Sequence, residues 1–322
     1  MNIKLWQAIN MALCDSMEEN DRILVIGQDV GIPGGPYGLT RGILDKFGPE
    51  RIIDTPISEA AMIACGIGAA VTGLYPIVDI MFLDFIALGM NQLVNQAAKY
   101  RFFTRDPDLE LPLVIHTLYG GRASMGAQHS QSLEAWLCHV PGLKVAFPST
   151  PQDAYEVLRA AIMDPDPVVV INSITLLRQR GNLDKLAADY QVGKGRCVRE
   201  GNDLTIVSYG PCVRLCEQAM SALQVNGDLI DLRWIQPWDD GLVIESVKKT
   251  SRLMVVHDGV EIGGLGGEIV ARIVNSGFWY LDAPPVRVGA NFSPIPVSSR
   301  DWRSLLPNLE RVQSGILEVL GV

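Results

Sequence analysis

Short apolar runs alternate with helical-period segments along most of the chain. Ile23–Ile26 is such a run, and Gly27 closes it, which is typical of a strand buried on both faces of a parallel sheet. Trp6–Glu19, just before it, carries apolar residues at helical spacing. The same unit of helix and then strand recurs at Glu59–Val71 with Pro76–Phe82, Leu88–Tyr100 with Leu111–His116, and Gln152–Met163 with Val168–Ile171. This alternation predicts an α/β domain built on a parallel sheet.

A change in residue composition separates two parts of the chain. Around Arg180–Gly201 charged and polar residues replace the apolar runs, and a second alternation then begins. Its predicted strands and helices are Leu204–Ser208, Cys212–Val225, Leu229–Leu232, Gly241–Thr250, Leu253–Val256, Glu268–Asn275 and Leu309–Leu320. We therefore expect two doubly wound α/β domains of unequal size, over 1–185 and 202–322, joined by a linker at 186–201.

Composition and charge exclude several classes of protein. The chain has 322 residues, 48% of them hydrophobic and 20% charged, and its formal charge is −9, which is ordinary globular composition with no basic footprint for nucleic acid. The uncharged stretch between Glu59 and Asp79 holds several glycines and a proline, so we predict a buried helix, a turn and a strand rather than a membrane span. The first residues have neither a secretion-signal nor a transit-peptide layout, which favours a cytoplasmic protein.

Several common site motifs are not matched. The six cysteines form no C-x-x-C pair and the four histidines have no metal-ligand spacing, so we expect buried, reduced thiols and no zinc site. Gly66-Ile67-Gly68 lies inside a helical pattern, where close helix packing explains it better than a dinucleotide. Gly264-Leu265-Gly266 follows a strand, but Ile269 stands where the dinucleotide fingerprint needs Gly or Ala. A Gly-Asp-Gly followed by Asn, the arrangement that holds Mg²⁺ and a diphosphate in thiamine-diphosphate enzymes, does not occur either.

Six other segments form an ordered set that resembles a known family. They are Gly27-Gln28-Asp29-Val30, Asp54-Thr55-Pro56-Ile57-Ser58-Glu59, Phe82-Leu83-Asp84-Phe85, Asn95-Gln96-Ala97-Ala98-Lys99, Gln128-His129-Ser130-Gln131-Ser132 and His139-Val140-Pro141-Gly142-Leu143-Lys144-Val145. Their order and spacing resemble the beta subunit of the decarboxylating first component of thiamine-diphosphate-dependent 2-oxo acid dehydrogenases. The likeness runs from about Ile23 to Val288. It implies a transketolase-like pyrimidine-binding domain followed by a smaller transketolase C-terminal-like domain.

The resemblance assigns roles to four side chains. Glu59 matches the glutamate that activates the cofactor, a task suited to a carboxyl group among apolar neighbours such as Ile57 and Met62. Phe85 matches the aromatic residue that packs on the pyrimidine ring, and Gln28 stands in the cofactor region, where the family usually has a glutamate. His129 matches the histidine that handles the intermediate or acyl transfer. Taken alone, Glu59 is also explained as a helix-dipole partner, Phe85 as core and His129 as structural.

A monovalent-cation site is also implied by the resemblance. It would surround a potassium ion with the backbone carbonyls of Leu113, Ala161 and Ile162, together with Asp164 and Asp166. Hard oxygen ligands suit such an ion. The alternative is a solvated acidic turn.

The implied enzyme needs a second chain. In this family the alpha subunit holds the diphosphate and Mg²⁺, so we expect a heterotetramer of two alpha and two beta chains that decarboxylates pyruvate or a branched-chain 2-oxo acid and passes the acyl group to a lipoyl domain. His116, where arginine is common, and Asn172, where glutamate is usual, depart from the pattern and leave the substrate open. The alternatives are acetoin cleavage, ketol or acyl transfer to a carrier protein, and a non-catalytic subunit.

Overall fold

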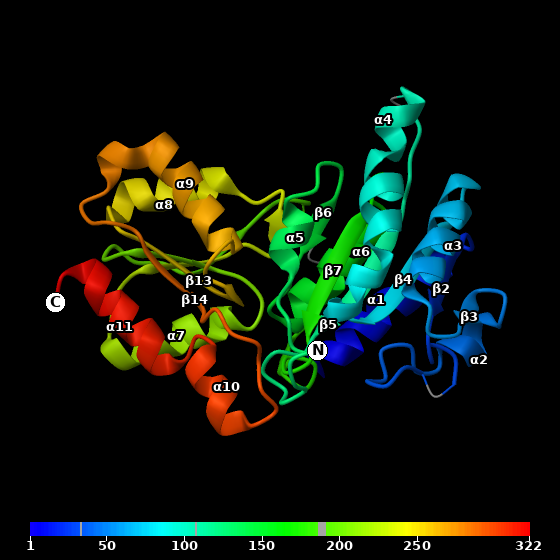
Figure 1. The fold of residues 1–322 in the computed structure, drawn as a ribbon, viewed down its shortest axis with the longest axis horizontal. Helices are drawn as coiled ribbons and strands as arrows, with labels where there is room; N and C mark the ends of the chain where they lie inside the picture. The colour runs from blue at the N-terminus through cyan, green and yellow to red at the C-terminus, as the bar shows by residue number, and fades with distance from the viewer. Residues whose placement is uncertain (33, 107, 186–190) are drawn as a thin grey trace. The chain divides into compact units, whose positions relative to one another are not determined.

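The computed structural model describes residues 1–32, 34–106, 108–185 and 191–322, and the chain forms two compact units. Unit 1 comprises Met1–Tyr119 and Trp136–Val192, and unit 2 comprises Gly120–Ala135 and Gly193–Val322. Each unit is an α/β layer structure (Figure 1). The part of the predicted linker at 186–190 lies outside the described residues.

Unit 1 is built on a parallel sheet whose strands follow the order β6-β7-β5-β4-β2-β3. Val and Ile are their commonest residues, and most of their side chains are buried because helices cover a parallel sheet on its faces; Ile53 and Asp54 at the edge strand β3 are exposed. The strands are β2 (Ile23–Gly27), β3 (Ile52–Asp54), β4 (Tyr75–Phe82), β5 (Val114–Tyr119), β6 (Lys144–Ala146) and β7 (Val168–Ser173). Two short strands, β1 (Asn2–Lys4) and β8 (Arg180–Asn182), pair antiparallel beside it.

Local sequence can fix where a helix of unit 1 begins. In α6, for example, the Thr150 side chain accepts a hydrogen bond from the Asp153 backbone N–H, and Pro151 occupies the first turn, where no donor is needed. Helix α6 packs along α1. The regular helices around this unit are α1 (Leu5–Glu19), α2 (Ile43–Phe47), α3 (Glu59–Val71), α4 (Tyr100–Thr104), α5 (Glu134–Cys138) and α6 (Pro151–Ile162).

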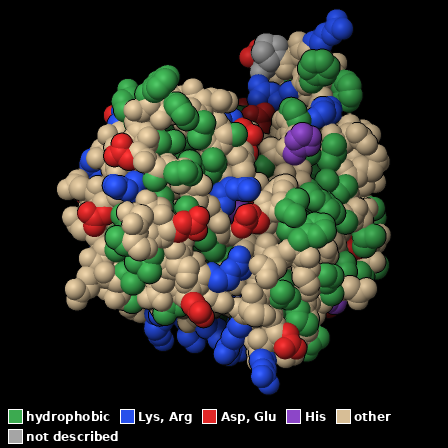
Figure 2. Space-filling view, turned by 60° about the vertical axis from the view of Figure 1, so that its left-hand side comes forward, with side chains coloured by type: hydrophobic (Ala, Val, Ile, Leu, Met, Phe, Trp, Pro, Cys, Tyr) green, Lys and Arg blue, Asp and Glu red, His purple; other side chains and the backbone are tan. Residues whose placement is uncertain are grey.

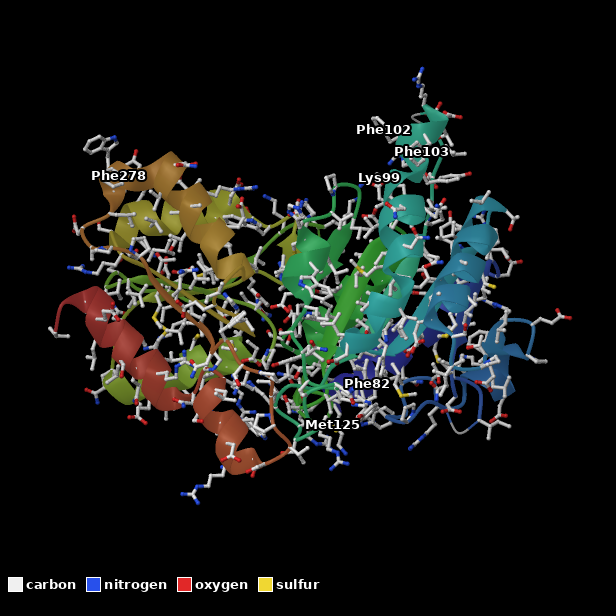
Figure 3. The ribbon with its side chains drawn as sticks, viewed as in Figure 1. Phe82, Lys99, Phe102, Phe103, Met125 and Phe278 are labelled. Carbon is white, nitrogen blue, oxygen red and sulfur yellow. The ribbon has the colours of Figure 1, made fainter. Side chains whose placement is uncertain are left out.

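The segment between β4 and α4 is helical but irregular, whereas the sequence predicts a regular helix over Leu88–Tyr100. It consists of 3₁₀-helix η1 (Leu83–Gly89), π-helix η2 (Asn91–Gln96) and 3₁₀-helix η3 (Ala97–Lys99). Gly89 lies so close to α3 that a Cβ atom there would meet Ile63 Cδ1 at 2.4 Å. Packing against α3 therefore constrains this segment more than helical periodicity does. Phe102 and Phe103 project from α4 at its far end (Figure 3).

Unit 2 has a five-stranded sheet in the order β14-β13-β10-β11-β9, parallel except for β9. Helices α7 and α11 pack together on one face, and α8 and α9 on the other. The strands are β9 (Arg196–Arg199), β10 (Thr205–Ser208), β11 (Asp228–Asp231), β13 (Leu253–Val260) and β14 (Val286–Ala290), with β12 (Trp234–Gln236) also in this part of the chain. The helices are α7 (Cys212–Leu223), α8 (Asp240–Thr250), α9 (Leu265–Gly277), η4 (Phe278–Tyr280), α10 (Ser299–Leu305) and α11 (Leu309–Leu320).

The predicted α/β fold class is confirmed, and helices α3 and α11 have the predicted bounds. Two details differ. Strand β5 begins at Val114 rather than Leu111, because Pro112 has no N–H for the ladder. The predicted linker at 186–201 contains β9, whose charged residues suit a short edge strand.

Surface and hydropathy agree with the exclusion of a membrane span. The uncharged stretch from Glu59 to Asp79 forms α3, a turn and most of β4, and within the described residues no helix is both long and apolar enough to cross a bilayer. Figure 2 shows a face where side chains of both charges are interspersed with hydrophobic ones. All six cysteines are free thiols, but the expected burial is confirmed only for Cys212 and Cys216, since Cys65 is exposed and the other three are half-buried.

Candidate functional site

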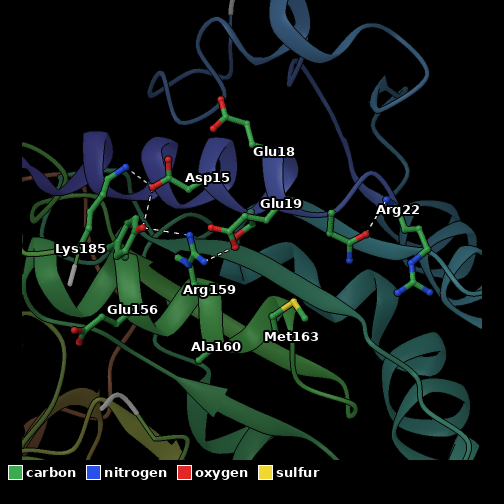
Figure 4. Close-up of a pocket in the computed structure, with 12 residues that line it drawn as sticks. Asp15, Glu18, Glu19, Arg22, Glu156, Arg159, Ala160, Met163 and Lys185 are labelled. Carbon is green, nitrogen blue, oxygen red and sulfur yellow. Dashed lines mark hydrogen bonds and ion pairs between the residues drawn. The ribbon is translucent and has the colours of Figure 1, made fainter. Parts of the chain in front are cut away.

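A broad hollow of about 1030 Å³ lies beside α1 and α6 on unit 1, but several of its charged side chains already pair with one another (Figure 4). Asp15 pairs with Lys185, and Glu19 pairs with Arg159. Burial and the hydrogen bond to Asp15 raise the pKa of Tyr155 to about 12. The hollow lies where α1 and α6 end, next to the amino ends of strands, whereas ligands of open α/β sheets bind at the carboxyl ends.

Three of the predicted cofactor residues do lie at carboxyl ends of neighbouring strands. Gln28 directly follows β2, Glu59 begins α3 after β3, and Phe85 follows β4. Because β3, β2 and β4 are adjacent and parallel, their carboxyl ends share one edge of the sheet. All three side chains are half-buried. The sheet therefore brings an acid, an amide and an aromatic ring to the edge where a ligand is expected.

Glu59 lies in the first turn of α3, where its negative charge complements the helix dipole. Only some of the apolar residues near Glu59 in the sequence are packed inside the protein. Met62 is buried, but Ile57 is 70% exposed. Phe85 packs edge-to-face against Phe82, with 6.2 Å between ring centroids. An apolar enclosure around the Glu59 carboxyl group thus requires further atoms beyond these neighbours.

Gln28 lines a small cavity together with Tyr37, Thr40 and Asp79. The cavity measures about 10 Å³, enough for a single water-sized group. The Gln28 side-chain amide Nε2 donates to Asp29 Oδ2 at 3.2 Å. Gln28 is therefore at the edge of a small niche of mixed polar and apolar lining rather than in an open binding cleft.

His129 is carried by a segment that packs with unit 2, although it follows β5 of unit 1 in the chain. The segment folds back on itself: His129 N–H donates to the Gly126 carbonyl at 3.2 Å, and a Cβ atom at Gly120 would meet the His129 carbonyl oxygen at 2.1 Å. Only glycine at position 120 permits this approach. His129 itself is half-buried.

Residues that sequence reasoning missed anchor this segment. Arg122 holds Asp258 through two hydrogen bonds of 2.7 and 2.5 Å and also donates to the Pro307 carbonyl at 2.8 Å. A bidentate pair of this kind fixes geometry as well as charge. No motif marks Arg122 in the sequence, because its partners lie more than 130 residues away.

A second anchor is the buried carboxyl group of Glu134. Tyr209 OH donates to Glu134 Oε1 at 2.9 Å, and Ser132 Oγ donates to Oε2 at 2.6 Å. Burial raises the pKa of Glu134. Trp302 Nε1 donates to Ser124 Oγ at 2.9 Å. This hydrogen bond anchors the earlier part of the same segment, before His129.

A mostly apolar hollow of about 410 Å³ lies beside this segment within unit 2. Its walls include Leu133, Val260, Ile295 and Leu306, and Ser130, the neighbour of His129, lies at its border. This size and lining suit a small apolar group.

The predicted cation residues meet at the end of α6, but their carboxylates already have cationic partners. Lys144 Nζ lies 2.6 Å from Asp164 Oδ1 and 3.1 Å from Asp166 Oδ2, and Arg101 Nη1 lies 2.6 Å from Asp166 Oδ1. These side chains therefore do not fit a potassium ion, and only backbone oxygens remain. In the described part of the chain, no group of three or more His, Cys, Asp or Glu side chains is arranged to hold a metal.

The comparisons with known proteins define the class. Residues 1–179 match the model of the transketolase pyrimidine-binding domain, and residues 193–312 match that of the transketolase C-terminal domain. Among solved structures, a split-gene transketolase described as an inactive beta4 tetramer superposes with a TM-score of 0.80 at 21% identity, over 99% of this chain and 98% of that one. A Pichia stipitis transketolase mutant gives 0.72 at 16% identity, over 99% and 46%. Both show the fold alone.

Relatives with higher sequence identity identify the family more specifically. The chain is 38% identical to the pyruvate dehydrogenase E1 component subunit beta-1 of Arabidopsis thaliana, over 95% of this chain and 86% of the relative. It is 36% identical to the 2-oxoisovalerate dehydrogenase subunit beta of Bacillus subtilis (strain 168), over 97% of both chains. The chain belongs to the family of E1 beta subunits of 2-oxo acid dehydrogenases, which confirms the resemblance seen in its motifs.

Proposed function

We propose that this chain is the beta subunit of a thiamine-diphosphate-dependent 2-oxo acid dehydrogenase that decarboxylates pyruvate or a branched-chain 2-oxo acid. The observation that supports this most is the shared edge in unit 1, where Gln28, Glu59 and Phe85 follow neighbouring parallel strands. An acid, an amide and an aromatic ring fit a flat heterocycle such as the aminopyrimidine. Thiamine diphosphate, when bound, supplies the carbanion that attacks the 2-oxo group.

The residues of this chain would prepare the cofactor. The Glu59 carboxyl group would share a proton with a ring nitrogen of the pyrimidine, and Phe85 would pack on the ring, which contributes about 0.5–1.5 kcal/mol beyond area burial. His129 would hold or deliver a proton at the reacting intermediate and serve acyl transfer to a lipoyl domain. Arg122 would act through the backbone, by anchoring the segment that carries His129.

The same site points to a partner chain. None of Gln28, Glu59 and Phe85 is positively charged, so this set offers nothing to neutralise a diphosphate, and an alpha subunit would hold the diphosphate and Mg²⁺. Unit 1 also exposes large apolar side chains, including Ile57 (70%), Leu88 (61%) and Phe102 (79%), which a partner would cover. We propose a heterotetramer of two alpha and two beta chains.

Other parts of the assignment rest on the family. We retain 1–185 and 202–322 as domain limits, with the segment 120–135 packing with the second unit. A potassium ion would be bound by backbone oxygens of Leu113, Ala161 and Ile162 with those of Asp164 and Asp166, and a higher unfolding temperature in KCl than in NaCl would support it. Equal unfolding temperatures would exclude it.

A second candidate is transfer of a two-carbon unit from acetoin or a ketol donor to a carrier. The departures at His116 and Asn172 from the family pattern leave the substrate open. A panel of pyruvate, 2-oxoisovalerate, acetoin and ketose phosphates, assayed with the alpha chain, separates these candidates. A non-catalytic subunit would show no turnover with any of them.

Replacement of Glu59 tests the assignment directly. In Glu59→Gln the proton-sharing group is lost while size is kept, so we expect turnover with the alpha chain to fall at least about 100-fold. Heterotetramer assembly, measured by sedimentation, should be unchanged, because the side chain is only half-buried. Wild-type turnover in this variant would refute the role of Glu59.

A further inference from the structure

A chain of three polar side chains crosses the middle of the unit 1 sheet. His116 Nδ1 lies 2.8 Å from Asp79 Oδ2, and Asn172 Nδ2 lies 3.1 Å from His116 Nε2. Asp79 and His116 are register partners on β4 and β5, and Asn172 on β7 is paired with Leu118, two residues beyond His116. Because side chains alternate between faces along a strand, all three lie on the same face of the sheet.

The chain is buried and specific in its hydrogen bonding. His116 is 3% exposed and Asn172 is 1% exposed. The Asp79 carboxylate only accepts, so His116 Nδ1–H donates to it, and the second ring nitrogen of His116 makes its contact with the Asn172 amide. The Asn172 Oδ1 atom then has no hydrogen-bond partner among the described residues. Leaving one member of a buried polar network incompletely satisfied costs free energy.

The other end of the chain reaches the cofactor edge. Asp79 is paired with Gly27, the last residue of β2, and it lines the same niche of about 10 Å³ as Gln28. The hydrogen bond of the Gln28 amide goes to Asp29 rather than Asp79, at 3.2 Å. The niche between Asp79 and Gln28 has room for one water molecule, whose donors and acceptor match a carboxylate and an amide.

From this geometry we propose that Asp79, His116 and Asn172 form a positioning unit that binds one ordered water between Asp79 and Gln28, and thereby orients the Gln28 amide toward the pyrimidine-binding edge. The inference rests on the proposed function, in which Gln28 contacts the cofactor. His116 fixes the Asp79 carboxylate, and Asn172 fixes the imidazole. The unit acts on binding of the cofactor rather than on the chemical step, because none of its members reaches the reacting atoms.

Two replacements of His116 separate this role from simple packing. Glutamine can donate to Asp79 through its amide and accept from Asn172 through its carbonyl, so His116→Gln should keep cofactor affinity within about twofold. His116→Leu fills the space but leaves Asp79 and Asn172 without their partner. We expect its Kd for thiamine diphosphate, measured calorimetrically on the complex with the alpha chain, to rise about tenfold, which corresponds to about 1.4 kcal/mol. Turnover at saturating cofactor should stay within about threefold.

A matched control lies on the same strand. Thr117 is fully buried, faces the opposite side of β5, and its hydroxyl has no hydrogen-bond partner in the described part of the chain. Thr117→Val should leave the Kd for the cofactor unchanged. If His116→Leu does not assemble, Asp79→Asn keeps size and a hydrogen bond to His116 but weakens the acceptor for the water, and it should raise the Kd in the same direction.

The water itself provides a readout without cofactor or activity. A high-resolution crystal structure of the unaltered complex should show an ordered water within hydrogen-bond distance of Asp79 and Gln28, and its absence would overturn the proposal. Equal cofactor affinity in His116→Leu and the unaltered chain would also overturn it, while leaving the proposed function intact. If the unaltered complex binds no thiamine diphosphate, the proposed function fails, and this inference fails with it.

Discussion

At the scale of single residues, burial changes the titration of a histidine outside the proposed site. His257 on β13 is fully buried, its Nε2 accepts a hydrogen bond from Gly266 N–H at 3.2 Å, and the Tyr209 ring stacks parallel to it at 6.0 Å. Burial lowers the pKa of His257 to about 4. The imidazole is therefore neutral in the folded protein at neutral pH, and it serves as a hydrogen-bond acceptor at the start of α9.

This depressed pKa predicts a pH-dependent loss of stability. Between about pH 6.5 and 4 the unfolded chain binds a proton at His257 while the folded chain does not, so the free energy of unfolding falls as pH falls through this window, by up to about 3 kcal/mol. The raised pKa of Glu134 acts in the opposite direction. Urea denaturation of the unaltered chain and His257→Gln at a series of pH values isolates the histidine. Parallel curves for the two proteins would contradict this prediction.

At the scale of elements, glycines decide how closely helices approach strands. A Cβ atom at Gly266 would lie 2.6 Å from His257 Nε2, which explains the glycine run before α9 by packing on β13 rather than by dinucleotide binding. On α3 the sequence predicts close packing for both Gly66 and Gly68. A Cβ at Gly66 would meet Val78 Cγ2 at 2.5 Å, but at Gly68 there is nothing within 4 Å. The expectation therefore holds for Gly66 only.

The two glycines of α3 make a matched pair. Gly66→Ala forces α3 away from β4, and we expect it to lower the free energy of unfolding by about 1–3 kcal/mol. Gly68→Ala adds a methyl group in open space and removes the backbone entropy of glycine, so it should raise stability by about 0.5–1 kcal/mol. Thermal and chemical denaturation measure both. Changes of the same sign would show that the packing of α3 on β4 is not the deciding factor.

At the scale of the whole molecule, this chain presents an incomplete site. Unit 1 brings an acid, an amide and an aromatic ring to one sheet edge, unit 2 carries His129 on an anchored segment, and exposed apolar side chains such as Phe102 remain on unit 1. The formal charge of −9 adds no general attraction for a diphosphate. Both features support the proposal that a partner chain completes the cofactor pocket.

A cofactor pocket shared between two chains can be tested by comparing the isolated chain with the complex. The isolated chain should bind thiamine diphosphate at least about 100-fold more weakly than the complex with its alpha subunit, because Gln28, Glu59 and Phe85 offer no positive charge to the diphosphate. Calorimetric titration of each species, with sedimentation to define its mass, provides the comparison. Tight binding and 2-oxo acid decarboxylation by the isolated chain would contradict a pocket built from two chains.

The sequence by itself determined the order and type of most elements, and it identified the family. Hydrophobic periodicity is a local property, so runs such as Ile23–Ile26 and the helix over Glu59–Val71 are readable without coordinates, and motifs such as Gln128–Ser132 are contiguous. Periodicity was less informative between Leu83 and Thr104, where contact with α3 governs the backbone, and in the polar region that holds β8 and β9.

Only the tertiary structure decided which distant residues meet. His116 and Asn172 look like two unrelated departures in the sequence, yet strand register places them in hydrogen-bond contact, with Asp79 on the third strand. Arg122 carries no local signal, yet Asp258 makes it an anchor. Strand order and register are set by packing over the whole sheet, and a linear pattern does not encode them. The side-chain partners that shape this site therefore became visible only in the folded chain.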